Sequence, residues 1–168
     1  KPLNNEEIKN LEKINSQVRM LFRPGKVLYS NNELLRDIII QIFTANKPWG
    51  VIFPRNAYIR EAARSTANIK FDDAIDFSGY SFFWAKMIAF VNSKKKIIFQ
   101  HNDLLADSQK VINGKAPHKK NLPAVFSIYS LFDRFLSVSK ETMEINKRNL
   151  KKYVREEQVG YTTNTIDV

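Results

Sequence analysis

Two short apolar runs, each ending in polar residues and each followed by a segment with helical spacing, constrain the fold of this chain most strongly. Residues 94–103 read KKKIIFQHND, and residues 132–140 read FDRFLSVSK. A short apolar run bounded by polar residues indicates a buried strand, and alternation of strands with helices is typical of a parallel sheet. The sequence therefore predicts an α/β fold: a three-layer, Rossmann-like domain in which helices flank a short parallel sheet.

Polar side chains at the ends of these two runs are the first candidates for a functional site. In open parallel sheets, ligands bind beyond the carboxyl ends of the strands. The residues expected at that edge are His101, Asn102, Asp103, Ser137, Ser139 and Lys140. We therefore expect the chemistry of this chain at the carboxyl edge of its sheet.

A third strand is predicted over residues 72–77, and it leads into a turn at Ser78 and Gly79. Glycine permits the tight backbone of a strand-to-helix turn, and residues 82–91 have the apolar pattern of a buried helix. Ser78 and Gly79 would then lie at the N-terminus of this helix, where free N–H groups and the helix dipole favour an anion. A capped helix end without a ligand explains the same pattern equally well.

The remaining elements are predicted from apolar spacing and capping residues. Helices are expected over residues 4–17, 55–65, 104–111, 122–131 and 139–154, and a strand over residues 18–22. Asn31 or Asn32 is expected to cap a further helix, whose apolar face is wide enough to imply packing on a sheet. Residues 1–154 are predicted to form one domain, and the polar tail 155–168 is predicted to be an interdomain linker.

The amino-acid composition excludes some kinds of site and indicates the charge of the expected partners. With 168 residues, 43% of them hydrophobic, the chain can bury one core. The absence of cysteine excludes a disulfide framework and a thiolate metal site, and with His101 and His118 as the two histidines a zinc centre is not expected. No apolar run approaches the ~20 residues that cross a bilayer. The net charge of +10 favours polyanions, which include nucleic acid, anionic lipid headgroups, phosphorylated polymers and nucleotide-linked substrates.

Four short motifs occur in a fixed order: IDFSGY at residues 75–80, FQHND at 99–103, FDRFLSVSK at 132–140 and NTID at 164–167. Together they resemble retaining glycosyltransferases of the two-Rossmann-domain type, the GT-B fold. The motif IDFSGY is also similar to bacterial teichoic acid and other wall-polymer transferases, including those joined to CDP-glycerol glycerophosphotransferase modules. The Gly-rich first unit and the acidic donor-binding element of the family do not occur in this sequence. The resemblance therefore implies the later part of an N-terminal, acceptor-side domain.

The resemblance also implies roles for the residues at the sheet edge. It implies that His101 is the catalytic histidine of the cleft, whose imidazole hydrogen-bonds near the reacting centre. A strand-end histidine with a purely structural partner explains this residue as well. The implied acceptor-binding residues are Ser78, Gly79, Asn102 and Asp103, and the implied hinge residues are Asn164 and Asp167. Neither a metal nor a cofactor within this fragment is implied.

The implied function is transfer of a sugar from a nucleotide-sugar donor to a cell-surface polymer or lipid-linked acceptor. The expected location is the cytoplasm, with peripheral contact to an anionic membrane surface. A C-terminal domain outside this sequence would bind the donor, so the fragment alone is not expected to turn over substrate.

Three alternatives stay open. The chain could belong to a CDP-glycerol glycerophosphotransferase-type wall teichoic acid enzyme, to a basic module that binds nucleic acid or another anionic polymer, or to a non-catalytic interaction domain. The basic residues are dispersed over several predicted helices and no nucleic-acid motif occurs, so nucleic acid is not the expected partner.

Overall fold

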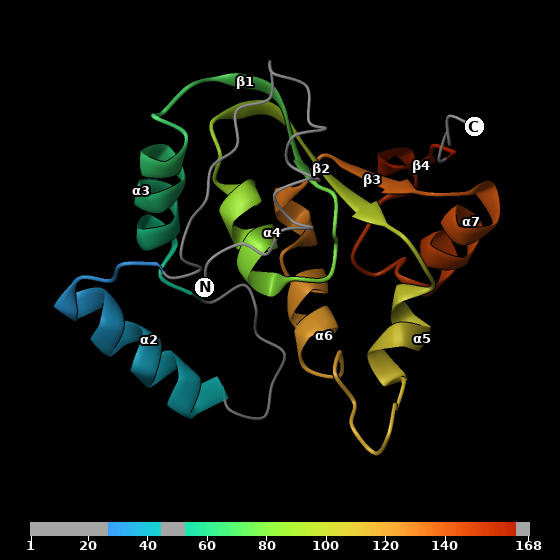
Figure 1. Cartoon of the computed structure of the whole chain (residues 1–168), viewed down its shortest axis with the longest axis horizontal. Coiled ribbons are helices and arrows are strands. Elements are labelled where there is room, and N and C mark those ends of the chain that lie inside the picture. The colour runs from blue at the N-terminus through green and yellow to red at the C-terminus, as the bar shows by residue number, and fades with distance from the viewer. Residues whose placement is uncertain (1–26, 45–52, 164–168) are drawn as a thin grey trace, which may run out of the picture.

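A computed structural model of the chain describes residues 27–44 and 53–163 (Figure 1). The helices are α2 (Asn31–Thr44), α3 (Arg55–Ser65), α4 (Phe82–Ala89), α5 (Leu104–Gln109), α6 (Asn121–Phe126) and α7 (Lys140–Asn149). Two short 3₁₀ turns are η1 (Tyr129–Leu131) and η2 (Glu156–Gln158), and the strands are β1 (Phe71–Asp76), β2 (Ser93–Gln100), β3 (Arg134–Ser137) and β4 (Val159–Tyr161). Strands and helices alternate from β1 to α7, which is the predicted succession, and β4 is an additional strand that was not predicted.

The four strands form one parallel sheet in the order β1-β2-β3-β4. The register places Asp76 beside Ile98 and Ile98 beside Phe135, so these side chains point to the same face. A parallel sheet flanked by helices confirms the predicted α/β class and is consistent with a Rossmann-like three-layer fold. β4 lies within the range 155–168 that the sequence assigns to a linker, because three residues are too few to show a strand pattern.

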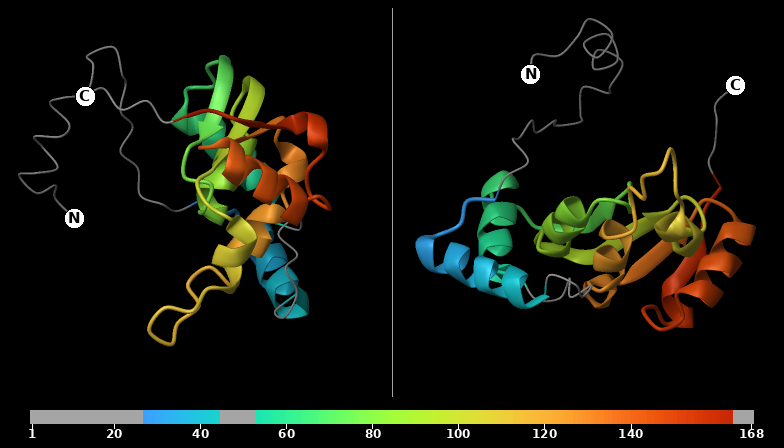
Figure 2. Two further views of the ribbon diagram at one scale, coloured as in Figure 1. Left: turned by 90° about the vertical axis from the view of Figure 1, so that its right-hand side faces the viewer. Right: turned by 90° about the horizontal axis from the view of Figure 1, so that it is seen from below.

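Helices α4 to α7 cover one face of the sheet (Figure 2). α4 packs on β1 and β2, α7 packs on β2, β3 and β4, and α5 and α6 contact each other and these helices. Because the strands follow the chain order, every right-handed crossover places its helix on the same face. Ala74 and Asp76 are therefore buried beneath the helices, whereas Ile75 and Phe77 on the other face are 48% and 61% exposed.

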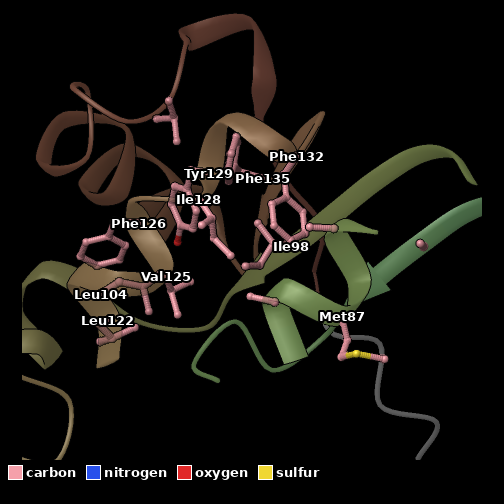
Figure 3. Packing of buried hydrophobic residues seen from close by; sticks show 14 of the residues in the cluster. Met87, Ile98, Leu104, Leu122, Val125, Phe126, Ile128, Tyr129, Phe132 and Phe135 are labelled. Atoms are coloured by element: carbon pink, nitrogen blue, oxygen red, sulfur yellow. The ribbon is translucent and has the colours of Figure 1, made fainter. Parts of the chain in front are cut away.

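The core lies between the sheet and these helices (Figure 3). Ile98 of β2 and Phe135 of β3 are fully buried, and the ring of Tyr129 lies 4.7 Å from that of Phe135. The helices and their connections contribute Met87, Leu104, Leu122, Val125, Phe126, Ile128 and Phe132 to the same cluster. Burying one large apolar side chain stabilises a fold by about 1.5–3 kcal/mol, so this cluster holds the ends of the strands in place.

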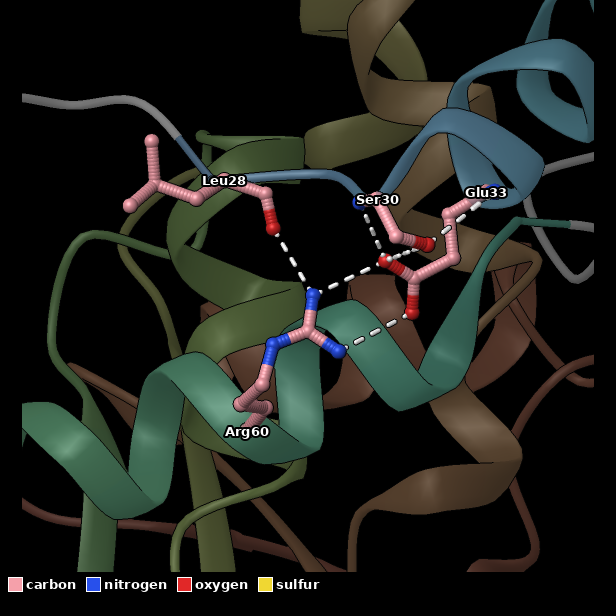
Figure 4. Close-up of polar contacts among 4 residues, drawn as sticks. All are labelled: Leu28, Ser30, Glu33 and Arg60. Atoms are coloured by element: carbon pink, nitrogen blue, oxygen red, sulfur yellow. Dashed lines mark hydrogen bonds and ion pairs between the residues drawn. The ribbon is translucent and has the colours of Figure 1, made fainter.

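Arg60 of α3 holds the start of α2 (Figure 4). Its guanidinium donates to the carbonyl of Leu28 at 2.8 Å and to the two carboxylate oxygens of Glu33 at 3.1 and 2.8 Å. The Glu33 carboxylate also accepts from the N–H of Ser30, and the Ser30 hydroxyl accepts from the N–H of Glu33. The hydrogen bonds from Arg60, followed by those from Ser30, lower the pKa of Glu33 to about 2. Ser30 is therefore the cap, in place of the predicted Asn31 or Asn32.

The apolar face of α2 is exposed. Six of its large apolar side chains are 45–80% exposed: Leu34, Leu35, Ile38, Ile39, Ile42 and Phe43. The prediction that this face packs on a sheet is therefore wrong for the described part of the chain. An apolar pattern indicates that a helix face can be buried, but it does not identify the partner.

Most other predicted elements are present. The helix predicted over residues 55–65 matches α3, and the predicted cap Ser139 accepts a hydrogen bond from the N–H of Thr142 at the start of α7. The elements predicted over residues 4–17 and 18–22 lie outside the described residues, as do the proposed hinge residues Asn164 and Asp167. None of the described helices is long and apolar enough to cross a membrane.

Candidate functional site

The chain segments that follow β1 and β2 bring the predicted site residues to one edge of the sheet. Nε2 of His101 lies 2.5 Å from the carbonyl oxygen of Phe77. Because a carbonyl only accepts, Nε2 carries the proton, and Nδ1 of the neutral ring is an acceptor. The His101 ring lies 4.9 Å from the Phe77 ring and stacks on the Phe99 ring at 6.0 Å. His101 is therefore on the face of the sheet opposite to the helices.

Asn102 lies on the helix side of the same edge, where it reaches Tyr80 and, through it, α5. Its side-chain amide donates to the Tyr80 hydroxyl at 3.0 Å, and that hydroxyl donates to Asp107 of α5 at 2.5 Å. The ring of His118 lies 5.2 Å from the Tyr80 ring. We call Tyr80, Asn102, Asp107 and His118 the Tyr80 cluster. Four segments meet there: the turns after β1 and β2, α5, and the loop before α6.

Tyr80 is the fixed centre of this cluster. Burial, and then the hydrogen bond to the Asp107 carboxylate, raise the pKa of Tyr80 to about 12, although the hydrogen bond from Asn102 opposes the shift. Tyr80 therefore stays protonated at neutral pH, and a protonated hydroxyl cannot accept a proton as a general base. Its role in this arrangement is to orient Asn102 and Asp107.

Several polar groups at the edge keep hydrogen-bonding capacity that no described residue uses. These groups are Nδ1 of His101, the side-chain carbonyl of Asn102, the second carboxylate oxygen of Asp107 and the hydroxyl hydrogen of Ser78. A mixture of donors and acceptors beside aromatic rings can hydrogen-bond to hydroxyl groups of a ligand. None of these four residues is an activated nucleophile. The chemistry of the edge is therefore that of binding and orienting a ligand, and not of attacking it.

Ser78 and Gly79 form the turn that leads from β1 towards α4. Gly79 has a φ of +67°, and its N–H donates to the carboxylate of Asp76 at 3.1 Å. A Cβ at this position would overlap the carbonyl oxygen of Phe99, so glycine is required. Ser81, two residues later, caps α4. The Gly79 N–H is thus engaged within the protein, and the exposed Ser78 is the member of this pair that a ligand can reach.

Asp103 caps α5. Its carboxylate accepts from a backbone N–H of α5 at 3.0 Å and from the side chain of Asn149 at 3.2 Å. Asn146 of α7 holds the same segment, because its buried side chain accepts from the N–H of Leu104 at 3.1 Å and donates to the carbonyl of Asn102 at 2.8 Å. α7 therefore positions Asn102, and contact of Asp103 with an acceptor stays a prediction.

A buried polar layer lies directly beneath the edge. Asp76, Gln100 and Ser137 are the last buried residues of β1, β2 and β3, and the Ser137 hydroxyl donates to Gln100 at 3.2 Å. Ser137, which was expected at the exposed edge, belongs to this layer. The second carboxylate oxygen of Asp76 is buried without a hydrogen-bond partner among the described residues. Burial raises the pKa of Asp76, against the opposing effect of backbone hydrogen bonds in its own turn.

We expect Asp76→Asn to leave the protein at least as stable as the wild type at pH 7. A carboxyl whose pKa is raised on folding stabilises the protein fully below its unfolded pKa of ~3.9 and loses that contribution as pH rises through the folded pKa. The advantage of the amide should therefore shrink between pH 7 and pH 4 in urea unfolding. Asp73→Asn, exposed on the same strand, is the control. A loss of stability in D76N that is equal at both pH values would contradict this account.

Sequence reasoning missed three members of the Tyr80 cluster as site residues: Tyr80, Asp107 and His118. Tyr80 follows the end of a predicted strand, as His101 does, and this position could have identified it as a site residue. Asp107 and His118 come from α5 and its following loop, and their approach to Tyr80 depends on tertiary packing. Among the described residues, no group of three His, Cys, Asp or Glu side chains could hold a metal ion.

Comparison of the sequence with protein-family models and with curated proteins finds no match.

Proposed function

We propose that this chain supplies the acceptor-binding side of a glycosyltransferase-type enzyme that acts on a hydroxyl of a sugar or polyol polymer. The observation that carries the proposal is the Tyr80 cluster, which collects hydroxyl-binding groups at the carboxyl edge of a parallel sheet. Ligand sites of open parallel sheets lie at this edge. The reaction class comes from the motif resemblance, which spans residues 75–167.

The edge is better suited to an acceptor than to a nucleotide donor. In doubly wound sheets the nucleotide binds where the strand order reverses, and the order does not reverse among the four described strands. The donor is therefore assigned to a second domain, and its phosphate and electrostatic environment would supply most of the catalysis.

His101 is proposed to face the reacting centre from the other face of the sheet. Its Nε2 is anchored on the Phe77 carbonyl, so Nδ1 of the neutral ring is left to accept a hydrogen bond from the acceptor hydroxyl. The same geometry would serve a CDP-glycerol glycerophosphotransferase-type enzyme, since that reaction also begins from an acceptor hydroxyl. If His101→Ala in the parent enzyme leaves transfer intact, the chain is an interaction domain without a catalytic role.

Titration of the 168-residue chain with a glycerol phosphate trimer, followed by amide NMR shifts, tests acceptor binding at the edge. We expect shifts around the Tyr80 cluster and a three- to tenfold weaker affinity, roughly the value of one hydrogen bond, for Asn102→Ala. Asn92→Ala is the matched control, because this asparagine is also exposed but lies at the opposite end of β2.

Two outcomes would overturn the proposal. One is unchanged affinity in both N102A and Tyr80→Phe. The other is failure to bind the trimer together with tight binding of single-stranded DNA that weakens steeply with salt, which would identify a nucleic-acid module.

A further inference from the structure

A groove of about 350 Å³ lies between α5, α6 and α7 on the helix side of the sheet. The apolar residues Leu105, Phe126 and Tyr153 line the groove. The ring centroids of Phe126 and Tyr153 are 5.5 Å apart. Lys119 from the loop before α6 and Lys152 after α7 are the exposed cations that line it. The volume falls within the ~300–1,000 Å³ that small-ligand sites commonly have.

The groove shares a wall with the Tyr80 cluster. Asp107 belongs to the cluster, and the next residue of α5, Ser108, lines the groove. In the loop before α6, His118 contacts Tyr80, and the next residue, Lys119, lines the groove. An extended ligand is thus offered hydroxyl-binding groups on one side of this wall and positive charge on the other.

The charges around the groove favour an anion. No described carboxylate lines it, and the neighbouring Asp103 is engaged by Asn149 and by its cap of α5. Neither Lys119 nor Lys152 forms an ion pair within the described part of the chain. The Lys152 ammonium lies 4.8 Å from the centre of the Tyr153 ring, which places positive charge beside an aromatic surface. Phosphate oxygens accept strong hydrogen bonds from ammonium groups.

We propose that this groove is a second subsite, which binds a phosphodiester group of a phosphorylated sugar or polyol polymer. The proposal deepens the proposed function and rests on it for the identity of the polymer. The phosphate binds to Lys119 and Lys152, while a neighbouring unit of the polymer presents its hydroxyls to the Tyr80 cluster. The groove thereby selects acceptors that carry negative charge next to the hydroxyl that reacts.

The test compares two double variants that remove the same charge. Lys119→Gln with Lys152→Gln changes the groove, and Lys70→Gln with Lys95→Gln changes exposed lysines near the amino ends of β1 and β2. We expect the groove variant to bind the glycerol phosphate trimer at least about tenfold more weakly, the value of one charge-assisted hydrogen bond. The control should lose less than about twofold, because exposed charges beyond ~10 Å are screened at 0.1 M salt.

Equal losses in the two double variants would overturn the subsite, since they would reflect net charge alone. Titration with inorganic phosphate should shift amide signals of groove residues such as Ser108 and Tyr153, and the absence of these shifts would also overturn it. The protein could instead bind phosphatidylglycerol vesicles through both groove lysines and fail to bind the trimer. That result would show that the groove binds the phosphate of lipid headgroups, and it would overturn the proposal that the ligand is a polymer.

The two proposals fail separately. Inorganic phosphate lacks the hydroxyls that the edge would bind, so N102A should leave its binding unchanged. If K119Q/K152Q weakens phosphate binding and neither N102A nor Tyr80→Phe weakens trimer binding, the anion subsite stands and the acceptor edge fails. If N102A weakens trimer binding and K119Q/K152Q does not, the acceptor edge stands and the subsite fails.

Discussion

Replacing Gly79 by alanine is expected to lower the free energy of unfolding by about 3 kcal/mol or more. At φ +67° an L-residue costs roughly 1–2 kcal/mol, and the added Cβ would also overlap the backbone carbonyl of Phe99. A clash with backbone of a neighbouring strand cannot be relieved by a rotamer change, so the turn must move. A loss of this size lowers the melting temperature of a chain of this length by roughly 6–12 °C.

Gly114→Ala is the matched control for this experiment. Gly114 has a φ of +73°, but a Cβ there would meet nothing within 4 Å. Its substitution should therefore cost only the backbone term of about 1–2 kcal/mol. The difference between the two variants measures the close approach of the turn after β1 to β2, and equal melting temperatures would show that this approach is not a constraint.

The strands that end in polar residues were predictable because a short apolar run bounded by polar residues indicates a central parallel strand. β2 and β3 have such runs, and their ends were predicted to within a few residues. β4 has three residues, of which Gly160 carries no side chain, so its pairing with β3 depends on tertiary contacts. α2 shows the opposite failure, since its strong local pattern predicted the helix correctly and its packing wrongly.

The location of the candidate site at the carboxyl edge of the sheet was predictable from the sequence, but the contacts between its side chains were not. His101 and Asn102 are adjacent in sequence and were expected to line one surface, yet His101 contacts Phe77 and Phe99, whereas Asn102 contacts Tyr80. Both residues follow the end of β2 at Gln100, and the chain bends at Asn102. The partners on each face could not be foreseen, because they come from separate turns and helices.

Two groups of exposed apolar residues in the described part of the chain lie away from the Tyr80 cluster. One lies on the open face of the sheet, where Ile75 and Phe77 are about half exposed, and the other is the apolar face of α2. The Tyr80 cluster is on the helix side, so neither surface includes it. Ligand binding at the cluster is therefore expected to be independent of whatever covers these faces.

Asn146 offers a second large effect, and one that connects stability with the site. Its side chain uses both a donor and an acceptor on backbone groups of the segment that follows β2, and it is 1% exposed. Asn146→Asp keeps the shape and the acceptor for Leu104 but loses the donor to the carbonyl of Asn102. An ionised carboxylate would face that carbonyl, so we expect a loss of about 3 kcal/mol at pH 7, measured by urea unfolding.

The pH dependence of this variant separates charge from shape. A buried aspartate at position 146 should have a raised pKa, so its contribution to stability is present below the unfolded pKa of ~3.9 and is lost as pH rises. The deficit of N146D should therefore shrink towards pH 4, where the protonated carboxyl can donate to the Asn102 carbonyl. Asn92→Asp, at an exposed position, should stay within about 0.5 kcal/mol of the wild type at pH 7. A deficit of N146D that does not change with pH would mean that packing, and not the donor to Asn102, gives Asn146 its importance.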